Sequence, residues 1–196
     1  MKLTRGRPKT FNEEEILLLA MQQFWKNGYD NTSLDDLLQA MNIKKSSFYA
    51  TFKNKEEIFS KALNLYRKNS ILYLNTLKEQ LGPKEALLFV ANEHVEQLKK
   101  DGEIKGCLIM NSSKECYKKY TYLSHQLKCE YDFFLDIFRE FISLAKESHS
   151  INNPLSAKIL SGRYSNTLNG LISTIKVGAD MEHIEDILIS LNELLS

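Results

Sequence analysis

Two short stretches of this chain have apolar residues at helical spacing and are separated by only two residues, Asn42 and Ile43. The first begins at Thr32 or Ser33, either of which can cap a helix, and two aspartates follow where the helix dipole favours acids. Asn42 comes next, and asparagine tolerates a left-handed backbone better than most residues other than glycine. The second stretch runs over 44–50. We therefore expect two short helices joined by a tight turn.

Helices are also expected on both sides of this pair. Asn12 is placed to cap a first helix that Gly28 ends. Asn54 and Glu57 have the spacing of a capping box, which opens a long helix running to about Gln80. The region before this long helix is expected to form a three-helix domain.

The rest of the chain also has helical periodicity. Only three prolines and eight glycines occur in 196 residues, and no segment alternates with the period of a strand. We predict an all-α fold of about nine helices, with a helix-turn-helix domain followed by a larger helical domain. The further helices are expected over 83–100, in a short buried segment from Cys107, from Leu123 to Ala145, over 154–177 and over 181–195.

Positive charge is concentrated at the N-terminal end. The whole chain has a net charge of +1, but residues 1–53 carry eight basic and six acidic side chains, and residues 1–10 carry four basic and none acidic. The helix pair lies in this positive region, so the charge distribution favours a local electrostatic attraction for nucleic acid there.

Composition favours an intracellular protein without bound metal. No run approaches the roughly 18 apolar residues that span a bilayer, and residues 1–15 lack the apolar core of a signal peptide. The cytoplasm is therefore the expected location. Cys107, Cys116 and Cys129 form no CxxC pair, which argues against a disulfide framework or a zinc site. No cofactor is expected.

The second helix of the pair has the chemistry of a DNA-reading helix. Lys44, Lys45 and Ser47 lie at its start, the part of such a helix that approaches base edges in the major groove. Lysine donates to guanine acceptors, and serine contacts either base type. Adjacent lysines alone would suggest only a solvated face, but this position favours base contact. Phe48 and Phe52 are expected to be core residues rather than base contacts.

Residues 5–59 resemble the N-terminal domain of the TetR/AcrR family of bacterial transcriptional regulators. The matching residues are Arg5-Gly6-Arg7-Pro8, the series Phe24, Gly28-Tyr29 and Thr32-Ser33, and the series Phe48-Tyr49, Phe52 and Lys55-Glu56. Beyond them, only the helical layout and the length agree with the family. The family usually has glycine where Asn42 stands, and often serine where Lys44 stands.

The resemblance implies that two parts of the chain have different functions. Residues 1–53 would form the DNA-binding domain with its basic arm, and residues 54–196 the effector-binding and dimerisation domain, with 54–80 as a connecting helix. Tyr49, Thr51, Thr32 and Lys55 would contact phosphate, and the arm would add minor-groove or phosphate contacts. The expected DNA-binding set is Arg5, Arg7, Thr32, Lys44, Lys45, Ser47, Tyr49, Thr51 and Lys55.

The last two helices are the expected dimer interface. Their apolar stripes would pair with those of a second copy, as the resemblance implies, while Gly162 and Gly170 would permit close approach. The alternative is that both stripes face only the core of their own chain. The expected interface residues are Leu160, Tyr164, Leu168, Leu171, Ile184, Leu188 and Leu191.

A pocket for a small apolar or aromatic effector is the next expectation. Several aromatic and polar residues fall on inward faces of different helices, where they would line a cavity or simply fill a packed core. The candidate lining is Tyr66, Phe89, His94, Met110, Tyr117, Phe134, Phe138 and Tyr164.

Cys107 is a candidate for thiol-based sensing. It follows Gly106 at an expected helix N-terminus, where the helix dipole favours thiolate. Cys116 or Cys129 would then resolve an oxidised Cys107. The alternative is that Cys107 is a small buried core residue.

Other classes of protein are less well supported. No HExxH, GxGxxG, P-loop or GxSxG pattern occurs, so an enzyme is not expected. A helical protein-interaction module would leave the basic arm and the lysines unexplained. The sequence therefore predicts a ligand-responsive homodimeric transcriptional regulator. The resemblance implies a repressor that leaves a palindromic operator on binding a small molecule.

Overall fold

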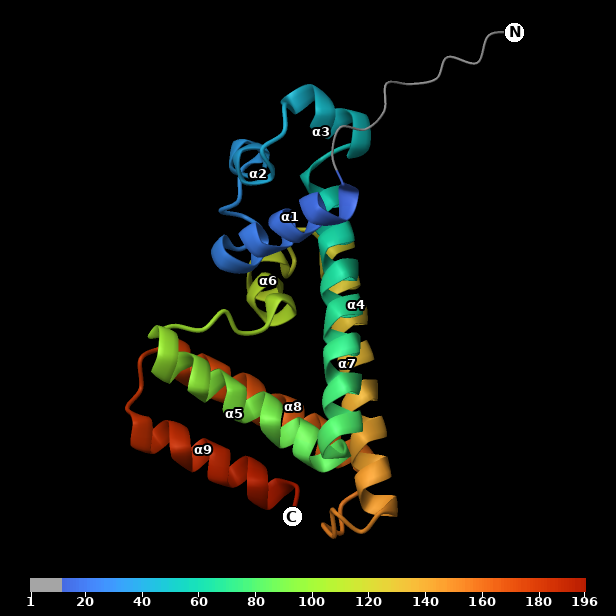
Figure 1. Cartoon of the computed structure of the whole chain (residues 1–196), viewed down its shortest axis with the longest axis vertical. Helices are drawn as coiled ribbons and strands as arrows, with labels where there is room; N and C mark the ends of the chain where they lie inside the picture. Colours follow the sequence, from blue (N-terminus) through green and yellow to red (C-terminus); the bar gives the residue numbers. More distant parts are fainter. Residues whose placement is uncertain (1–11) are drawn as a thin grey trace, which may run out of the picture. The chain divides into compact units, whose positions relative to one another are not determined.

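The computed structural model describes residues 12–196, and within this range the chain forms nine helices and no strand (Figure 1). The all-α fold expected from the sequence is thus confirmed. The helices are α1 (Glu13–Asn27), α2 (Leu34–Met41), α3 (Lys45–Thr51), α4 (Lys55–Leu81), α5 (Pro83–Asp101), α6 (Leu108–Cys116), α7 (Thr121–Glu147), α8 (Ala157–Lys176) and α9 (Met181–Leu194).

The chain divides into two compact units within α4. The first unit ends at Tyr66 and the second begins at Arg67, so α4 contributes its first turns to one unit and its remaining turns to the other. No helix in residues 12–196 combines the length and apolar character that a membrane-spanning helix needs.

An aromatic cluster holds the first unit together. Phe24 of α1 and Phe59 of α4 are fully buried, with ring centroids 4.9 Å apart in an edge-to-face arrangement. Tyr29 lies against the same ring of Phe59, at 4.8 Å. Phe48 of α3 and Phe52 are buried as well, which confirms that they belong to the core. The Lys61 ammonium of α4 lies 5.0 Å from the centroid of the Phe52 ring, so the end of α3 packs beside α4.

The turn between α2 and α3 has the geometry that the sequence predicts. Ser33 caps α2 in a reciprocal capping box with Asp36, with N–H to oxygen distances of 3.1 and 2.8 Å. Asn42 has φ 51° and ψ 44°, in the left-handed region. The Asn42 N–H donates to the carbonyl of Gln39 at 3.1 Å, which ends α2 and redirects the chain into α3.

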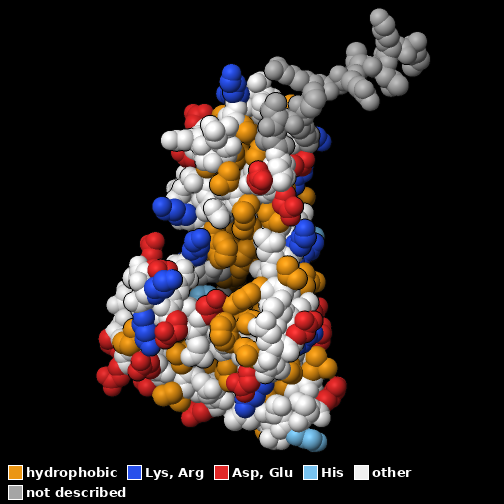
Figure 2. Space-filling view, in the orientation of Figure 1, with side chains coloured by type: hydrophobic (Ala, Val, Ile, Leu, Met, Phe, Trp, Pro, Cys, Tyr) orange, Lys and Arg blue, Asp and Glu red, His pale blue; other side chains and the backbone are white. Residues whose placement is uncertain are grey.

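The second unit packs α5, α7, α8 and α9 around one apolar core, with α6 against α7. Tyr164 of α8 is fully buried in this core, and its hydroxyl donates to the carbonyl of Leu87 at 2.7 Å. Where α5 and α9 lie in Figure 2, acidic and basic side chains surround apolar side chains that reach the surface. Phe89 is one of the large apolar residues of this unit that are exposed.

One helix begins later than expected. The sequence places the start of α8 near 154, whereas the helix begins at Ala157 with Ser156 as its cap. The reason is local: the Asn153 side chain accepts a hydrogen bond from the Leu155 N–H at 3.1 Å, which forms a turn before the helix. The hydroxyl of Ser156 then accepts from the Ile159 N–H.

Candidate DNA-binding surface and pocket

The exposed face of α3 carries the polar residues that the sequence assigns to base contact. Lys45 and Lys44, the residue before the helix, are exposed, and Ser47 is half-buried. Phe48 points to the opposite face and is fully buried, so α3 is anchored on one side and free on the other. Such a helix presents its N-terminal residues to a major groove without losing its packing.

Tyr49 lies on this same exposed face. Its side chain is 52% exposed, and its ring lies edge-on to Phe48 at 5.3 Å. This contact fixes the ring while leaving much of it at the surface, as a phosphate-contacting tyrosine requires. The hydroxyl of Thr51 donates to the Ser47 carbonyl at 3.3 Å, so it retains only its acceptor capacity.

Lys55 and Thr32 support the loop between α1 and α2. The Lys55 ammonium donates to the carbonyls of Tyr29 and Thr32, at 3.0 and 3.2 Å, and lies 4.3 Å from the centroid of the Tyr29 ring. Two of its three donors are therefore used within the protein.

The structure corrects the phosphate contact expected of the Thr32 side chain. Thr32 is fully buried, and its hydroxyl donates to the Gly28 carbonyl at 2.6 Å. A buried hydroxyl that already serves the loop has no surface to offer a phosphate. Arg5 and Arg7, the other expected contacts, lie outside the described residues.

Two exposed residues extend this surface beyond the predicted set. Ser46 and Lys53 are both exposed, one in the first turn of α3 and the other just after it. The position of Ser46 in the first turn of α3, directly after Lys45, could have identified it from the sequence. Residues 44–55 contain four lysines and no acidic residue, so the surface is cationic. The nearby Glu57 carboxylate is occupied, since it accepts from the Lys53 N–H at 2.9 Å.

The fold and this cationic helix define a helix-turn-helix DNA-binding regulator, and comparison with known proteins identifies its family. Residues 16–62 match the family model described as bacterial regulatory proteins, tetR family. The HTH-type transcriptional regulator YezE of Bacillus subtilis (strain 168) is 30% identical over 184 residues, which cover 92% of this chain and 94% of that protein. The chain belongs to the TetR family of bacterial transcriptional regulators.

Two further proteins are similar to this chain, one over about a third of its length and the other over nearly all of it. The HTH-type transcriptional repressor ComR of Escherichia coli (strain K12) is 46% identical over 66 residues, or 34% of this chain and 31% of ComR. A cysteine mutant of the TetR family regulator CifR, complexed with 26-bp double-strand operator DNA, is 25% identical. Its TM-score is 0.79, and the match covers 96% of this chain and 98% of CifR.

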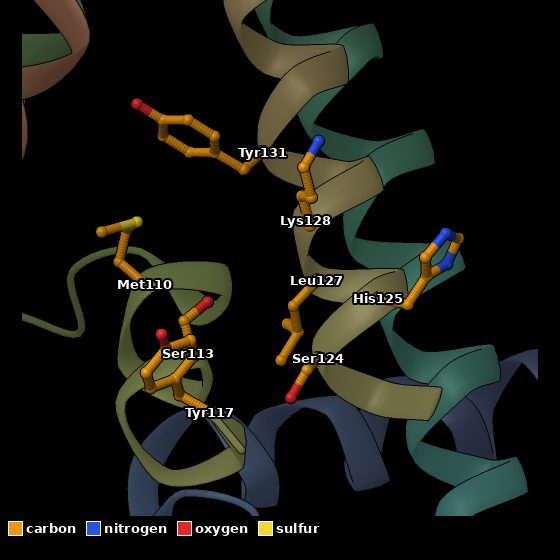
Figure 3. Close-up of a pocket in the computed structure, with 8 residues that line it drawn as sticks. All are labelled: Met110, Ser113, Tyr117, Ser124, His125, Leu127, Lys128 and Tyr131. Atoms are coloured by element: carbon orange, nitrogen blue, oxygen red, sulfur yellow. The ribbon is translucent and has the colours of Figure 1, made fainter. Parts of the chain in front are cut away.

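A pocket of about 510 Å³ lies in the second unit between α6 and α7 (Figure 3). Met110, Ser113 and Tyr117 face it from the α6 side, and Ser124, Leu127 and Tyr131 from α7, whereas the ring of His125 points away from these residues in this view. The lining residues are Met110, Ser113, Tyr117, Ser124, His125, Leu127, Lys128 and Tyr131.

Only Met110 and Tyr117 belong to both this lining and the predicted set. Tyr66 lies in the first unit, where its ring meets Trp25 at 5.1 Å. The ring of Phe138 lies edge-on to that of the buried Tyr164, with the centroids 5.0 Å apart. Its centroid lies 6.4 Å from that of Phe134, so all three residues belong to the packed core. The other two expected residues are on α5: Phe89 is exposed, and His94 Nδ1 lies 2.7 Å from the Val90 carbonyl. The spacing of residues 124, 127, 128 and 131 could have placed these four on one face of α7, but not the packing of α6 against that face.

The apolar stripes of α8 and α9 form the core of their own chain. Of the seven expected interface residues, only Leu188 is half-buried rather than buried. The other six have no surface left for a partner, so an interface through these helices must use their opposite faces. Those six are Leu160, Tyr164, Leu168, Leu171, Ile184 and Leu191.

The three cysteines have different surroundings. Cys107 precedes α6 and is half-buried, Cys116 is buried, and Cys129 is exposed with its sulfur 3.8 Å from His125 Nδ1. Burial lowers the pKa of the Lys176 ammonium, the nearby charge of Lys114 adds to this effect, and Cys107 opposes it. A sensing role for Cys107 stays a prediction.

No cluster of metal-ligating residues occurs within 12–196.

A buried carboxylate joins α7 to the second part of α4. Glu130 is 2% exposed, and one of its oxygens lies 3.4 Å from a guanidinium nitrogen of Arg67. Its other oxygen, Oε2, is buried without a hydrogen-bond partner. Burial raises the pKa of Glu130, and the Arg67 charge only partly opposes this. The charged form is therefore disfavoured in the folded state.

We expect Glu130→Gln to stabilise the protein at neutral pH. Because the folded-state pKa of Glu130 is raised, its contribution to stability is fully present below the ordinary glutamate pKa of 4.5 and is lost as the pH rises through the folded value. The gain for Glu130→Gln should be about 1 kcal/mol, because the neutral amide avoids the cost of burying a charge, which is roughly 1.4 kcal/mol for each unit by which a pKa is raised. Urea unfolding at pH 7.5 and near pH 4 would measure it. A variant less stable than wild type at pH 7.5 would show that the Arg67 ion pair outweighs burial.

Proposed function

We propose that this protein is a homodimeric repressor that binds a palindromic operator through α3 and releases it when a small molecule binds the second unit. The observation that carries the proposal is the exposed cationic face of α3 on a helix-turn-helix anchored by Phe48. Two comparisons support it: ComR is named a repressor, and the CifR structure contains operator DNA. Its place of action would be the cytoplasm.

The proposed DNA contacts follow from exposure. Lys44, Lys45 and Ser46 offer donors and acceptors to base edges at the start of α3, with half-buried Ser47 beside them. Tyr49 and Lys53 would contact phosphates, together with the remaining donor of Lys55 and the acceptor of Thr51. The basic arm would add Arg5 and Arg7, as the family resemblance implies.

A second copy would pack on the exposed face of α8. This face presents Ile159, Gly162, Asn166, Gly170 and Val177 at helical spacing, and all except half-buried Gly162 are exposed. A Cβ at either glycine would meet no atom of its own chain within 4 Å, so the small residues leave room for a partner helix. Such small positions permit close packing around a two-fold axis.

Charge favours pairing of α8 with the partner's α9. The charged residues of α8 are all lysine or arginine, whereas α9 contains aspartate and glutamate but no lysine or arginine. Two-fold symmetry would repeat the contact between α8 of one copy and α9 of the other. The interface would therefore be electrostatically self-complementary. Arg163 on α8 and Glu185 on α9 are exposed members of these two sets.

Gly170→Trp is expected to convert the dimer to a monomer at micromolar concentration. The indole would fill the space that a partner helix needs, while the open surroundings of Gly170 and the low helix propensity of glycine make unfolding of the chain an unexpected result. Gln80→Trp adds the same side chain at an exposed position of α4 and should remain dimeric. Sedimentation velocity distinguishes the two, and a Gly170→Trp protein that stays dimeric would place the interface elsewhere.

The operator itself is the direct test of the proposed function. Genomic fragments from the source organism would be selected with the purified full chain and sequenced, and the recovered sites footprinted. We expect an inverted repeat whose half-sites lie about 34–36 Å apart or a multiple of it. Enrichment of unrelated fragments without a shared repeat would contradict operator binding.

A further inference from the structure

We propose that the pocket between α6 and α7 binds a neutral molecule with an aromatic ring more tightly than an anionic molecule with the same rings. This inference rests on the proposed effector function, because it names the chemical class of effector. The pocket volume of about 510 Å³ is in the range that holds a small organic ligand.

The walls of the pocket favour a flat apolar ring. Met110 supplies a thioether, Leu127 an aliphatic surface, and Tyr117 and Tyr131 aromatic rings from opposite sides (Figure 3). Tyr117 is 70% exposed, which is unusual for a large aromatic side chain and leaves its face available to a ligand. Rings stack on rings, and methionine sulfur also packs well against aromatic edges.

The two serine hydroxyl groups of the pocket are already committed as donors, which leaves the phenol groups of Tyr117 and Tyr131 as the hydroxyl donors of the lining. Ser113 donates to the Ile109 carbonyl at 2.7 Å, and Ser124 donates to the Cys116 carbonyl at 2.7 Å. Each hydroxyl oxygen retains only its acceptor capacity. These oxygens can receive an N–H or O–H from a neutral ligand, but they have no hydrogen to offer a carboxylate, sulfonate or phosphate.

The one lysine of the lining already has a carboxylate partner. The Lys128 ammonium forms an ion pair with Asp132 one turn further along α7. A ligand anion would have to compete with that carboxylate, and it would lie against apolar walls where an unpaired charge is costly. A neutral aromatic molecule with an N–H or O–H group meets no such cost.

A matched pair of fluorescent probes tests this selectivity on the full chain. N-phenyl-1-naphthylamine is neutral and has one N–H, and 1-anilinonaphthalene-8-sulfonate has the same rings with an added sulfonate. We expect the neutral probe to bind saturably with one site per chain and the sulfonate to bind at least about tenfold more weakly. Equal or tighter binding of the sulfonate would overturn the assignment.

Two variants and one control locate the probe. Tyr117→Ala removes an exposed ring and should weaken binding of the neutral probe several-fold, up to about tenfold. Ser113→Trp should fill the pocket and abolish binding. Tyr122→Ala removes another exposed tyrosine, 60% exposed and outside the lining, and should leave binding unchanged. Equal effects of Tyr117→Ala and Tyr122→Ala would place the probe outside the pocket.

Failure of this inference can be distinguished from failure of the proposed function. Operator affinity is measured separately by anisotropy, with and without the neutral probe. If the probe binds the pocket and operator affinity does not change, the ligand class stands and the effector role of the pocket falls. If the free protein binds no operator, the repressor proposal falls while the probe titration still decides the ligand class.

Discussion

Lys45→Ala is expected to weaken operator binding by at least about thirtyfold. Lys45 is the first residue of α3 and is exposed on the face opposite the buried Phe48. A lysine contact to a guanine edge is worth about 1–3 kcal/mol, and a homodimer loses it in both half-sites. Fluorescence anisotropy with the footprinted site would measure the change. The variant should also discriminate less between that site and a scrambled sequence.

Two other lysines show whether the effect belongs to base reading. Lys53→Ala should weaken binding to all sequences equally and reduce the salt dependence, because a phosphate contact carries no sequence information. Lys99→Ala removes an exposed lysine of α5 that pairs with Glu96, and should leave affinity near the wild-type value. A Lys45→Ala protein that binds as tightly as Lys99→Ala would exclude Lys45 from the reading surface.

Phe59→Ala should cost about 3–5 kcal/mol of unfolding free energy, the usual range for a buried phenylalanine. Phe59 is fully buried, and its ring contacts Phe24 at 4.9 Å and Tyr29 at 4.8 Å. Its removal leaves a cavity at the centre of the aromatic cluster that positions the helix-turn-helix. Urea unfolding followed by circular dichroism measures the loss.

An exposed leucine in the same unit supplies the comparison. Leu18 of α1 is 39% exposed, so Leu18→Ala should cost well under the Phe59→Ala value, at about 0.5–1 kcal/mol. Similar losses for the two variants would mean that the cluster around Phe59 is not the centre of stability in this unit.

Local chemistry explains why the helices and the turn could be predicted from the sequence. Ser33 and Asp36 need only each other to form a capping box, and Asn42 needs only its own tolerance of a left-handed backbone. The start of α8 was predicted three residues too early. There, Asn153 and Ser156 are both capping types, and only the geometry shows that Asn153 makes a turn while Ser156 caps the helix.

Tertiary partners explain what the sequence left open. The hydroxyl of Thr32 turns inward to the Gly28 carbonyl, and the Lys55 ammonium turns to carbonyls more than twenty residues away along the chain. An apolar stripe such as that of α8 indicates a buried face without saying whether its own chain or a second copy covers it. The pocket likewise depends on how α6 packs on α7, which no local pattern encodes.

Sequence-specific recognition by α3 is tested by the salt dependence of binding to the recovered operator. Wild type, Lys45→Ala and Gly170→Trp would be titrated by anisotropy onto the palindrome and onto a scrambled duplex at two salt concentrations. We expect tight, salt-sensitive binding of a wild-type dimer to the palindrome alone, with both variants strongly impaired. Weak binding of wild type to both duplexes with equal affinity would contradict sequence-specific recognition by α3.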